Sequence, residues 1–189
     1  MSERISISAL PGRVEALLRE RERVVLALDG PCAGGKTTLA LRLAAEQGWG
    51  VVHMDDFFLR PAQRTPERYA TPGGNVDYER FLAEVLEPLE RGRPAEFRPL
   101  DCATLTFADP VRLEPGRVLL VEGAYACHPA LWDHYDLRLF LPVEPQVQLE
   151  RLRRRCPERL GAFEEKWIPL ERAYFAAYRL PERCDLILT

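Results

Sequence analysis

Long apolar runs, paired cysteines and a signal pattern are all missing from this sequence, and each absence excludes a class of protein. No apolar run approaches the 18 residues of a membrane-spanning helix, and the first residues lack the charged-then-apolar pattern of a secretion signal. The five cysteines are odd in number and have no C-x-x-C spacing, which argues against a zinc site and a disulfide framework. We expect a soluble, cytoplasmic protein with reduced thiols that does not bind membranes.

Lysine is also scarce, and arginine supplies almost all of the 26 positively charged side chains. The formal net charge is −3, so no basic field indicates nucleic acid as a partner. Lysine occurs only at positions 36 and 166 in a chain of 189 residues, a length that suits one domain with a sizeable core. We therefore expect a single domain over residues 1–189, and whether it forms a homo-oligomer stays open.

One of the two lysines lies in a phosphate-binding motif. Residues 30–37 match the pattern G-x-x-x-x-G-K-[ST], in which glycines let backbone N–H groups turn toward an anion. Lys36 would reach the β- and γ-phosphates of a nucleotide, and the Thr37 hydroxyl would bind Mg²⁺. An apolar run precedes the motif and a helix-forming run follows it, so the loop meets a helix N-terminus, which favours phosphate. We expect the nucleotide to contact Gly30, Pro31, Cys32, Ala33, Gly34, Gly35, Lys36, Thr37 and Thr38.

Strand-like and helix-like segments alternate along the chain. The expected strands cover 23–29, 51–56, 118–123, 137–141 and 185–188, and the expected helices cover 9–22, 35–46, 77–91, 128–134, 144–155 and 161–178. Residues 95–114 are expected to add one or two short edge strands. This alternation predicts an α/β fold with a parallel sheet covered by helices on both faces.

Carboxylates follow two of these strands. Asp55 and Asp56 end the strand 51–56, and Glu122 lies at the end of the strand 118–123. Ligands of an open parallel sheet bind at the carboxyl ends of its strands, where the loop at Gly30 also begins. Carboxylates there can accept a proton from an attacking hydroxyl or hold Mg²⁺, as phosphoryl transfer requires. A solvated turn, a helix cap or a surface charge would use the same residues, so the pattern alone leaves those alternatives open.

The segment 57–75 is rich in proline and arginine, and we expect neither helix nor strand in it. A stretch of this length without regular structure in a compact domain is usually a lid or a binding loop. We interpret about 57–76 as a loop that closes over an acceptor molecule. Asp77 is the expected N-cap of the helix that follows.

The helix expected at 144–155 carries several arginines. Their spacing of i, i+3, i+4 and i+8 would place four of them on one helix face: Arg151, Arg154, Arg155 and Arg159. One interpretation is a lid over about 150–162 whose arginines contact the nucleotide phosphates during transfer. The other is a solvated face that Glu150 and Glu158 partly neutralise. Pro157 is expected to end the helix.

These segments resemble the uridine kinase family, the P-loop kinases of nucleosides and related small alcohols, which also include nicotinamide riboside kinases and phosphoribulokinases. The resemblance runs from Val24 to Leu188 and rests on DGPCAGGKTTLA, HMDDFFLRP, VLLVEGAY and ERLRRRCPER, with a weaker match in GGNVDYERF. It implies a P-loop NTPase fold of nucleotide-kinase type, with a five-stranded, mostly parallel sheet and an arginine-rich helical lid.

The resemblance also implies roles for individual residues. Asp55 would be the catalytic base and, with Thr37 and Glu122, would hold Mg²⁺. Lys36, Arg154 and Arg155 would act in catalysis, and Arg151 and Arg159 would bind ATP. The acceptor would contact Asp56, Phe58, Arg60 and Asp77, the last through ribose hydroxyls. Uridine and cytidine kinases carry a Tyr and a His for the pyrimidine before the VEG motif, but residues 99–105 of this chain have neither, so uridine itself is not implied.

We therefore expect an ATP- and Mg²⁺-dependent kinase of an alcohol group on a small molecule, with a nucleoside or ribosyl compound as the leading acceptor. Two other interpretations stay open. One is a nucleotide-dependent switch or regulatory ATPase acting on a protein partner, although no N-K-x-D element for reading guanine is present. The other is a nucleotide-binding module without turnover, against which the paired carboxylates argue.

Overall fold

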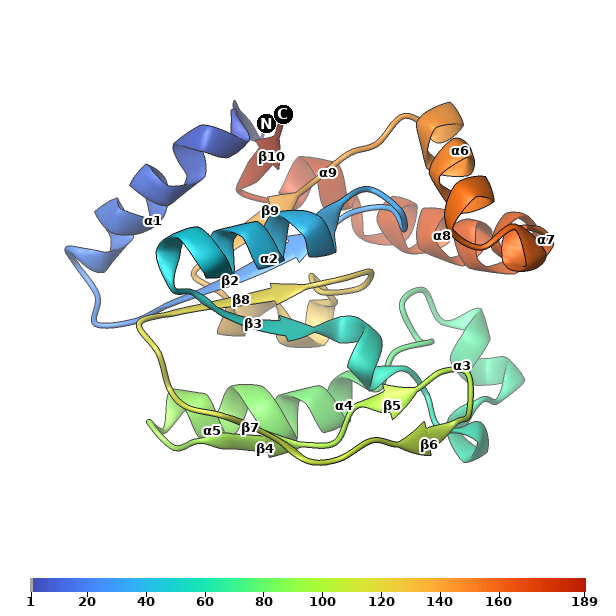
Figure 1. Ribbon diagram of the computed structural model, residues 1–189, viewed down its shortest axis with the longest axis horizontal. Coiled ribbons are helices and arrows are strands. Elements are labelled where there is room, and N and C mark those ends of the chain that lie inside the picture. Colours follow the sequence, from blue (N-terminus) through green and yellow to red (C-terminus); the bar gives the residue numbers. More distant parts are fainter. Residues whose placement is uncertain (1) are drawn as a thin grey trace.

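The computed structural model describes residues 2–189 and centres on a parallel β-sheet (Figure 1). Its strands are β1 Glu3–Ile5, β2 Val24–Asp29, β3 Gly50–His53, β8 Val118–Glu122, β9 Leu137–Phe140 and β10 Leu186–Leu188. In this part of the chain they form a six-stranded sheet in the order β1-β10-β9-β2-β8-β3, and each neighbouring pair is parallel. The expected α/β class and parallel sheet are confirmed.

The sheet has one strand more than the five that the family resemblance implied. The added strand is β1, which pairs with β10 from Glu3↔Leu186 to Ile5↔Leu188. It contains three residues, two of them exposed, so it lacks the apolar run by which the other strands were predicted.

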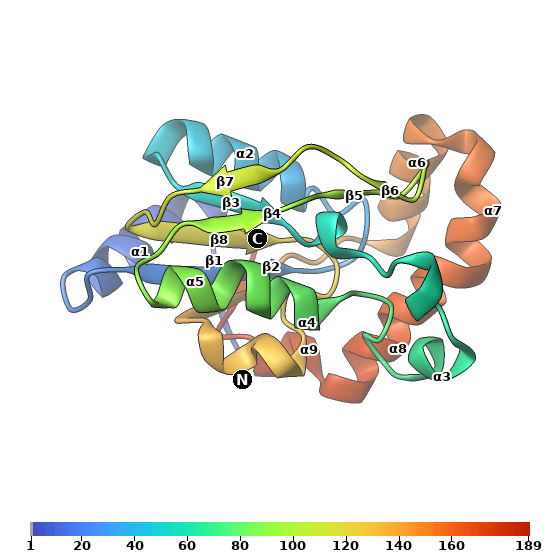
Figure 2. The ribbon, with the colours of Figure 1, turned by 90° about the horizontal axis from the view of Figure 1, so that it is seen from below.

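Helices cover both faces of the sheet (Figure 2). On one face lie α1 Leu10–Leu18 and α2 Lys36–Gln47, which pack against Leu26 and Leu28 of β2. On the other lie α4 Tyr78–Phe81, α5 Glu87–Glu90, α8 Ile168–Tyr178 and α9 Leu180–Arg183, which pack with Ala27 of the same strand. Successive residues of a strand point to opposite faces, so β2 supplies apolar side chains to both cores.

The region expected to form one or two edge strands contains four very short ones. β4 Ala95–Phe97 pairs antiparallel with β7 Val111–Leu113, and β5 Leu100–Asp101 pairs antiparallel with β6 Thr106–Phe107. The helix expected over 77–91 is present, with a π-helical turn at Leu82–Leu86 between α4 and α5. Asp77 is its N-cap, as predicted, since its carboxylate accepts the Arg80 N–H at 3.2 Å.

The prediction that 57–75 contains no helix was wrong. A 3-10 turn covers Pro61–Gln63, and the short helix α3 covers Pro66–Ala70. Each begins with proline, whose fixed φ suits a first helical position, and the Thr65 hydroxyl accepts the Arg68 N–H at 3.2 Å as a cap. Proline here starts helices rather than breaking them.

The arginine-rich segment leaves the sheet after β9. The helix α6 Pro145–Arg155 ends just before Pro157, as predicted, and a 3-10 turn Pro157–Arg159 leads to α7 Leu160–Ala162. A π-helical turn at Phe163–Trp167 then joins α7 to α8. In Figure 1, α6 and α7 lie beyond the carboxyl ends of the strands, with α3 below them.

No helix found in residues 2–189 combines the length and hydrophobicity of a membrane crossing.

Candidate functional site

The motif loop joins β2 to α2, as its sequence predicts. Gly30 has a φ of +143°, and a Cβ at this position would lie 2.3 Å from the Leu141 carbonyl oxygen, so only glycine fits. The Lys36 ammonium folds back into the loop and donates to the carbonyl oxygens of Gly30 at 2.7 Å and Pro31 at 2.9 Å. The loop therefore holds its lysine in a buried, fixed position at the N-terminus of α2.

Glu122 ends β8 and is buried beside this loop. Its Oε1 accepts the Thr37 hydroxyl at 3.0 Å and lies 2.5 Å from Nδ1 of His53, at the end of β3. Its Oε2 is also buried and has no hydrogen-bond partner within residues 2–189. The hydrogen bond with Glu122 raises the pKa of His53, because the carboxylate stabilises the protonated ring.

Asp55 follows β3 and opens onto the same end of the sheet. Its side chain is exposed along the cleft, but the protein atoms around it exclude enough water to raise the pKa of its carboxyl. The positive charge of Lys36 opposes that rise. Asp56 is half-buried, and loss of solvent likewise raises the pKa of its carboxyl.

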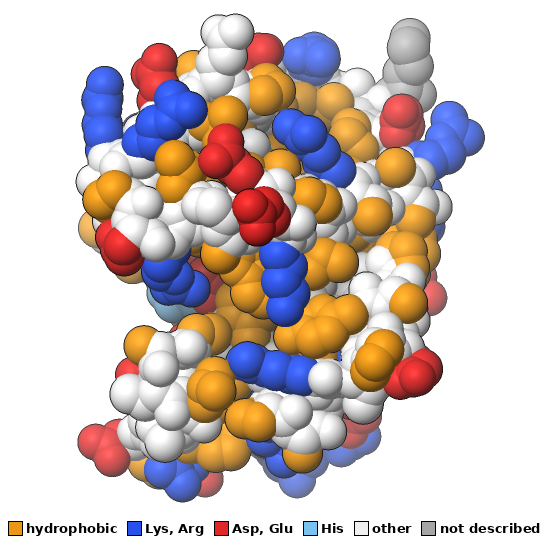
Figure 3. Space-filling model, turned by 90° about the vertical axis from the view of Figure 1, so that its right-hand side faces the viewer, with side chains coloured by type: hydrophobic (Ala, Val, Ile, Leu, Met, Phe, Trp, Pro, Cys, Tyr) orange, Lys and Arg blue, Asp and Glu red, His pale blue; other side chains and the backbone are white. Residues whose placement is uncertain are grey.

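Two adjoining cavities meet at Asp55. The first, the loop cavity, is lined by residues 32–38 of the motif loop together with Asp55, Glu122, Arg151 and Arg155. The second, the side cavity, has a volume of about 390 Å³ and lies between the loop 57–76 and the lid. Both are lined by Cys32, Asp55, Ala124 and Arg155. Figure 3 shows this end of the molecule hollowed, with apolar side chains inside and basic ones at the rim.

The four predicted lid arginines do not all line the same cavity. Arg151 lines the loop cavity and donates to the Ala33 carbonyl at 3.0 Å, while Arg155 lines both cavities. Arg159 lines the side cavity alone, and Arg154 lines neither. The prediction of one shared helix face was wrong for Arg159, because α6 ends at Arg155 and the chain turns at Pro157.

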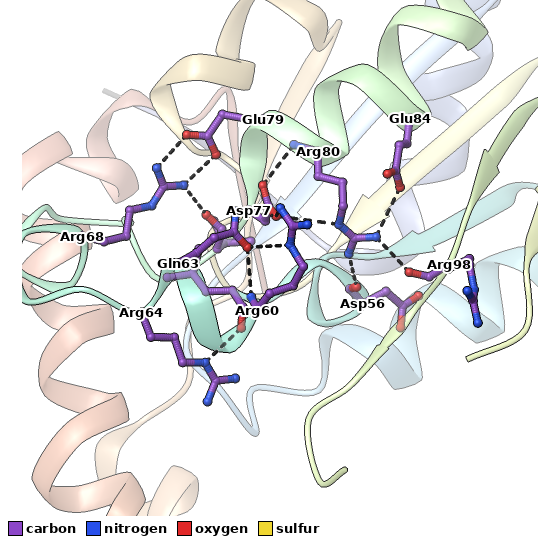
Figure 4. A network of polar contacts seen from close by, with 12 residues as sticks. Asp56, Arg60, Gln63, Arg64, Arg68, Asp77, Glu79, Arg80, Glu84 and Arg98 are labelled. Atoms are coloured by element: carbon purple, nitrogen blue, oxygen red, sulfur yellow. Dashed lines mark hydrogen bonds and ion pairs between the residues drawn. The ribbon is translucent and has the colours of Figure 1, made fainter. Parts of the chain in front are cut away.

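The residues predicted to contact an acceptor also divide into two groups. Asp56 and Phe58 line the side cavity. Among residues 2–189, the lining of this cavity includes neither Arg60 nor Asp77. Asp77 is buried, accepts the Gln63 amide at 2.8 Å, and lies 3.7 Å from an Arg60 nitrogen (Figure 4). In this structure, Asp77 holds the base of the loop together.

A neighbouring arginine fixes the same loop from its other side. Arg68 donates to both carboxylate oxygens of Glu79 at 2.6 Å and to the carbonyls of Gly74 and Val76 (Figure 4). It also lies over the Tyr78 ring, 4.7 Å from its centroid. The half-buried Arg68 thus ties the loop to the exposed Glu79 in the first turn of α4.

Sequence reasoning missed two buried carboxylates. Asp29, at the end of β2, accepts the N–H groups of Gly30 and Cys127 and the Tyr174 hydroxyl, at 2.6, 2.9 and 2.9 Å. Glu171 of α8 accepts the Cys32 N–H, and burial raises its pKa to about 7. The one available signal for Glu171 was its position between Ile168 and Tyr174 on the apolar face of a helix.

No protein-family model matches the sequence, and no curated protein matches it. A solved structure described as a possible uridine kinase from Bacillus stearothermophilus superposes with a TM-score of 0.68 at 20% identity, covering 95% of this chain and 99% of that one. A D-glycerate 3-kinase from Cryptococcus neoformans var. grubii serotype A gives 0.60 at 15% identity, covering 87% and 86%. The protein TT1252 from Thermus thermophilus gives 0.53 at 13%, covering 89% and 90%.

The fold is that of the P-loop kinases. The strands β2, β8 and β3 are adjacent in the sheet. The motif loop follows β2, Glu122 ends β8, and Asp55 follows β3. This adjacency, which the order of the strands creates, brings together residues that lie far apart in the sequence.

Proposed function

We propose that this protein is an ATP-dependent phosphotransferase that transfers the γ-phosphoryl group of ATP to an alcohol group of a small molecule. One observation carries the proposal: the loop cavity and the side cavity meet at Asp55. ATP phosphates in the first cavity and an acceptor in the second would therefore place both reactants against one carboxylate. Positioning of this kind supplies much of the catalysis in phosphoryl transfer.

The roles of the charged residues follow from their positions. Asp55 takes the proton of the acceptor hydroxyl as a general base, since it is a carboxylate that lines both cavities. Lys36 and Arg151 line the loop cavity and bind ATP phosphates, and Arg155, which lines both cavities, stabilises charge on the transferring group. Arg154 lines neither cavity, so its proposed catalytic role would require movement of the lid.

The residues at the end of β8 fit a magnesium ion. Mg²⁺ prefers oxygen ligands and is usually held by one or two carboxylates together with substrate phosphates. The buried Oε2 of Glu122 has no partner in the described part of the chain, and the Thr37 hydroxyl is adjacent to the same carboxylate. No three His, Cys, Asp or Glu side chains of residues 2–189 form a metal site by themselves. Thr37, Glu122 and Asp55 would hold Mg²⁺, which when bound neutralises phosphate charge.

The experiment is acceptor-stimulated ADP release from Mg²⁺·ATP. A panel of nucleosides, nicotinamide riboside, pantothenate and sugars is offered to the wild type, to Asp55→Asn and to the exposed control Asp109→Asn. We expect one acceptor to stimulate the wild type and the control equally. Asp55→Asn should lower kcat by about 10²- to 10⁴-fold while still binding ATP. ATP hydrolysis that no acceptor changes would contradict the proposal and favour a regulatory ATPase.

A further inference from the structure

Three arginines line the side cavity, and none has a carboxylate partner. Arg64 comes from the loop 57–76, and Arg155 and Arg159 come from the lid segment. Within residues 2–189, no carboxylate oxygen lies within 4.0 Å of a guanidinium nitrogen of these three arginines, so none of them forms an ion pair there. Arg64 is half-buried, and Arg155 and Arg159 are exposed, so water solvates these guanidiniums now and an anion bound in the cavity would supply the counter-charge that the protein does not.

Neighbouring arginines of the same region differ in this respect. Arg60 pairs with Asp77, Arg68 pairs with Glu79, and Arg80 pairs with Glu84. Figure 4 shows these three within the polar network at the start of α4, whereas Arg64 extends away from it. The loop therefore neutralises the arginines that fix its own structure and leaves the cavity-lining arginine without an acidic partner.

The side chains of Arg64 and Arg159 are each held by a neighbouring group. Arg64 is half-buried, and its Nε donates to the Leu59 carbonyl at 3.0 Å, which restricts the side chain. Its two terminal amino groups form no hydrogen bond within residues 2–189. Arg159 is oriented by the Phe163 ring, 5.9 Å from its guanidinium carbon. Planar guanidiniums with free amino groups bind carboxylates and phosphates through two parallel hydrogen bonds.

Arg64 and Arg159 lie around the same part of the side cavity, close enough for both charges to affect Cys102. Cys102 also lines it. Burial and the negative charge of Asp55 raise the pKa of its thiol, and the positive charges of Arg64 and Arg159 both oppose that rise. Neither arginine lines the loop cavity, whereas Arg155 lines both. Arg155 is thus placed for the phosphates of ATP, and the pair Arg64 and Arg159 is left for a group on the acceptor.

The side cavity is also lined by three carboxylates, Asp55, Asp56 and Glu171, and within residues 2–189 none of them forms an ion pair with Arg64 or Arg159. Glu171 accepts the Cys32 N–H, and its pKa of about 7 keeps a large share of it neutral at physiological pH. Asp55 lies at the junction with the loop cavity, where Lys36 acts on it. Besides the half-buried Asp56 and the buried Asn75, the remaining wall is mostly apolar or aromatic, including Phe58, Leu59, Leu100, Tyr69 and Trp167.

We propose that the acceptor is an organic anion: a hydroxyl compound that also carries a carboxylate or phosphate group, bound by Arg64 and Arg159. This inference rests on the proposed function. The acceptor hydroxyl lies at Asp55, which takes its proton as the new oxygen–phosphorus bond forms. The bond between the γ-phosphorus and the bridging oxygen of ATP breaks, and ADP leaves with that oxygen. A neutral nucleoside would leave both guanidiniums without a counter-charge.

The test compares matched neutral, carboxylate and phosphate compounds as acceptors. The sets are glycerol, glycerate and glycerol 3-phosphate; ribose, ribonate and ribose 5-phosphate; and pantothenyl alcohol with pantothenate. We measure ADP release and, separately, binding by calorimetry without ATP. The enzymes are the wild type, Arg64→Gln, Arg64→Lys, Arg159→Gln and Arg153→Gln, a control that removes an exposed lid arginine lining neither cavity.

We expect the anionic member of at least one set to bind and react better than its neutral counterpart. Arg64→Gln and Arg159→Gln should each raise its KM and dissociation constant by about 10- to 100-fold, since hydrogen bonds between charged groups are lost. Arg64→Lys should recover part of the loss, Arg153→Gln should match the wild type, and the KM for ATP should not change in Arg64→Gln. Whether the carboxylate or the phosphate member responds identifies the anion.

Three results would overturn the inference. They are equal use of neutral and anionic members, an unchanged KM for the anion in a folded Arg64→Gln enzyme, and no anion that binds the wild type more tightly than the two Gln variants. Failure of the proposed function looks different. In that case anions still bind in an Arg64-dependent way, but no compound stimulates ADP release.

Discussion

The carboxylate of Glu171 accepts the backbone N–H of Cys32 with both of its oxygens, at 3.0 and 3.2 Å. The same loop residue is held from the other side by Gln148, whose amide donates to the Cys32 carbonyl at 3.0 Å and contacts its sulfur at 3.2 Å. Gln148 lies in α6 just before the lid segment 150–162, and Glu171 lies in α8 after it. One residue of the phosphate-binding loop is therefore anchored to both ends of the lid segment.

The first prediction concerns pH. Burial raises the pKa of Glu171 from its ordinary value of 4.5 to about 7, so the folded chain holds more protons than the unfolded chain between these values. The free energy of unfolding should therefore fall as pH rises through this range, by up to about 3 kcal/mol from this group. Glu171→Gln removes the titration, so the variant should gain stability relative to the wild type between pH 4.5 and 8. Urea unfolding at several pH values measures this, and a difference that is independent of pH would contradict it.

The second prediction concerns Gly123, which follows Glu122. Its φ is +141°, and a Cβ there would lie 2.9 Å from Met54 Cβ and 3.5 Å from Asp55 Oδ1. Gly123→Ala should lower the free energy of unfolding by about 1–3 kcal/mol and should also lower kcat by displacing Asp55. Gly12→Ala is the matched control, because Gly12 lies in α1 with no atom within 4 Å of an added Cβ, and it should stabilise the chain by about 0.5 kcal/mol. Equal stability of the two variants in thermal unfolding would refute the steric argument.

The third prediction concerns Asp29, a fully buried carboxylate that accepts three hydrogen bonds. In Asp29→Asn, an amide NH₂ replaces one acceptor oxygen and faces a backbone N–H that then has no partner. We expect the free energy of unfolding to fall by about 1–3 kcal/mol, measured from the denaturant midpoint. ATP binding should also weaken, because Asp29 orients Gly30. Tyr174→Phe removes only one of the three donors and should cost about 1 kcal/mol with little change in ATP affinity.

The fourth prediction separates two roles of Asp77. Asp77→Ala removes the cap of α4 and the acceptor for Gln63, and should destabilise the chain by about 1–2 kcal/mol. Asp77→Asn retains a capping oxygen, so its free energy of unfolding should fall less than that of Asp77→Ala. If Asp77 also binds the acceptor, both variants raise the acceptor KM. A KM that follows wild type in the folded Asn variant would limit Asp77 to holding the loop.

The phosphate-binding half of the site could be predicted because its signals are local. The loop from Gly30 to Thr37 is continuous in sequence, and Asp55 and Glu122 each follow a recognisable strand. Glu171 gives no such signal, because its partner Cys32 is 139 residues away and the contact exists only after α8 packs under the loop. Arg64 was likewise one arginine among several in its loop, and only the pairing of its neighbours with acids sets it apart.

The errors in the fold prediction have similar causes. A three-residue strand such as β1 acquires its hydrogen bonds from β10, at the other end of the chain, and its own sequence carries too little apolar pattern to indicate it. The prolines of 57–75 were interpreted as helix breakers, although Pro66 stands at a first helical position behind the cap Thr65. Arg159 was assigned to a helix face from its spacing alone. Because α6 ends at Arg155, Arg159 does not belong to that helix.

The π-helical turn at Phe163–Trp167 has a consequence for the shape of the side cavity. Residues four apart in an α-helix drift about 40° around its axis, and the wider π turn makes the same step drift in the opposite sense. The two steps from Phe163 to Trp167 and on to Glu171 therefore offset each other, and all three line the side cavity. One residue more than an α turn requires aligns two rings and a carboxylate in a single column. Deleting one residue there would rotate Phe163 by about 100° relative to Glu171, so the two side chains would no longer line the same cavity.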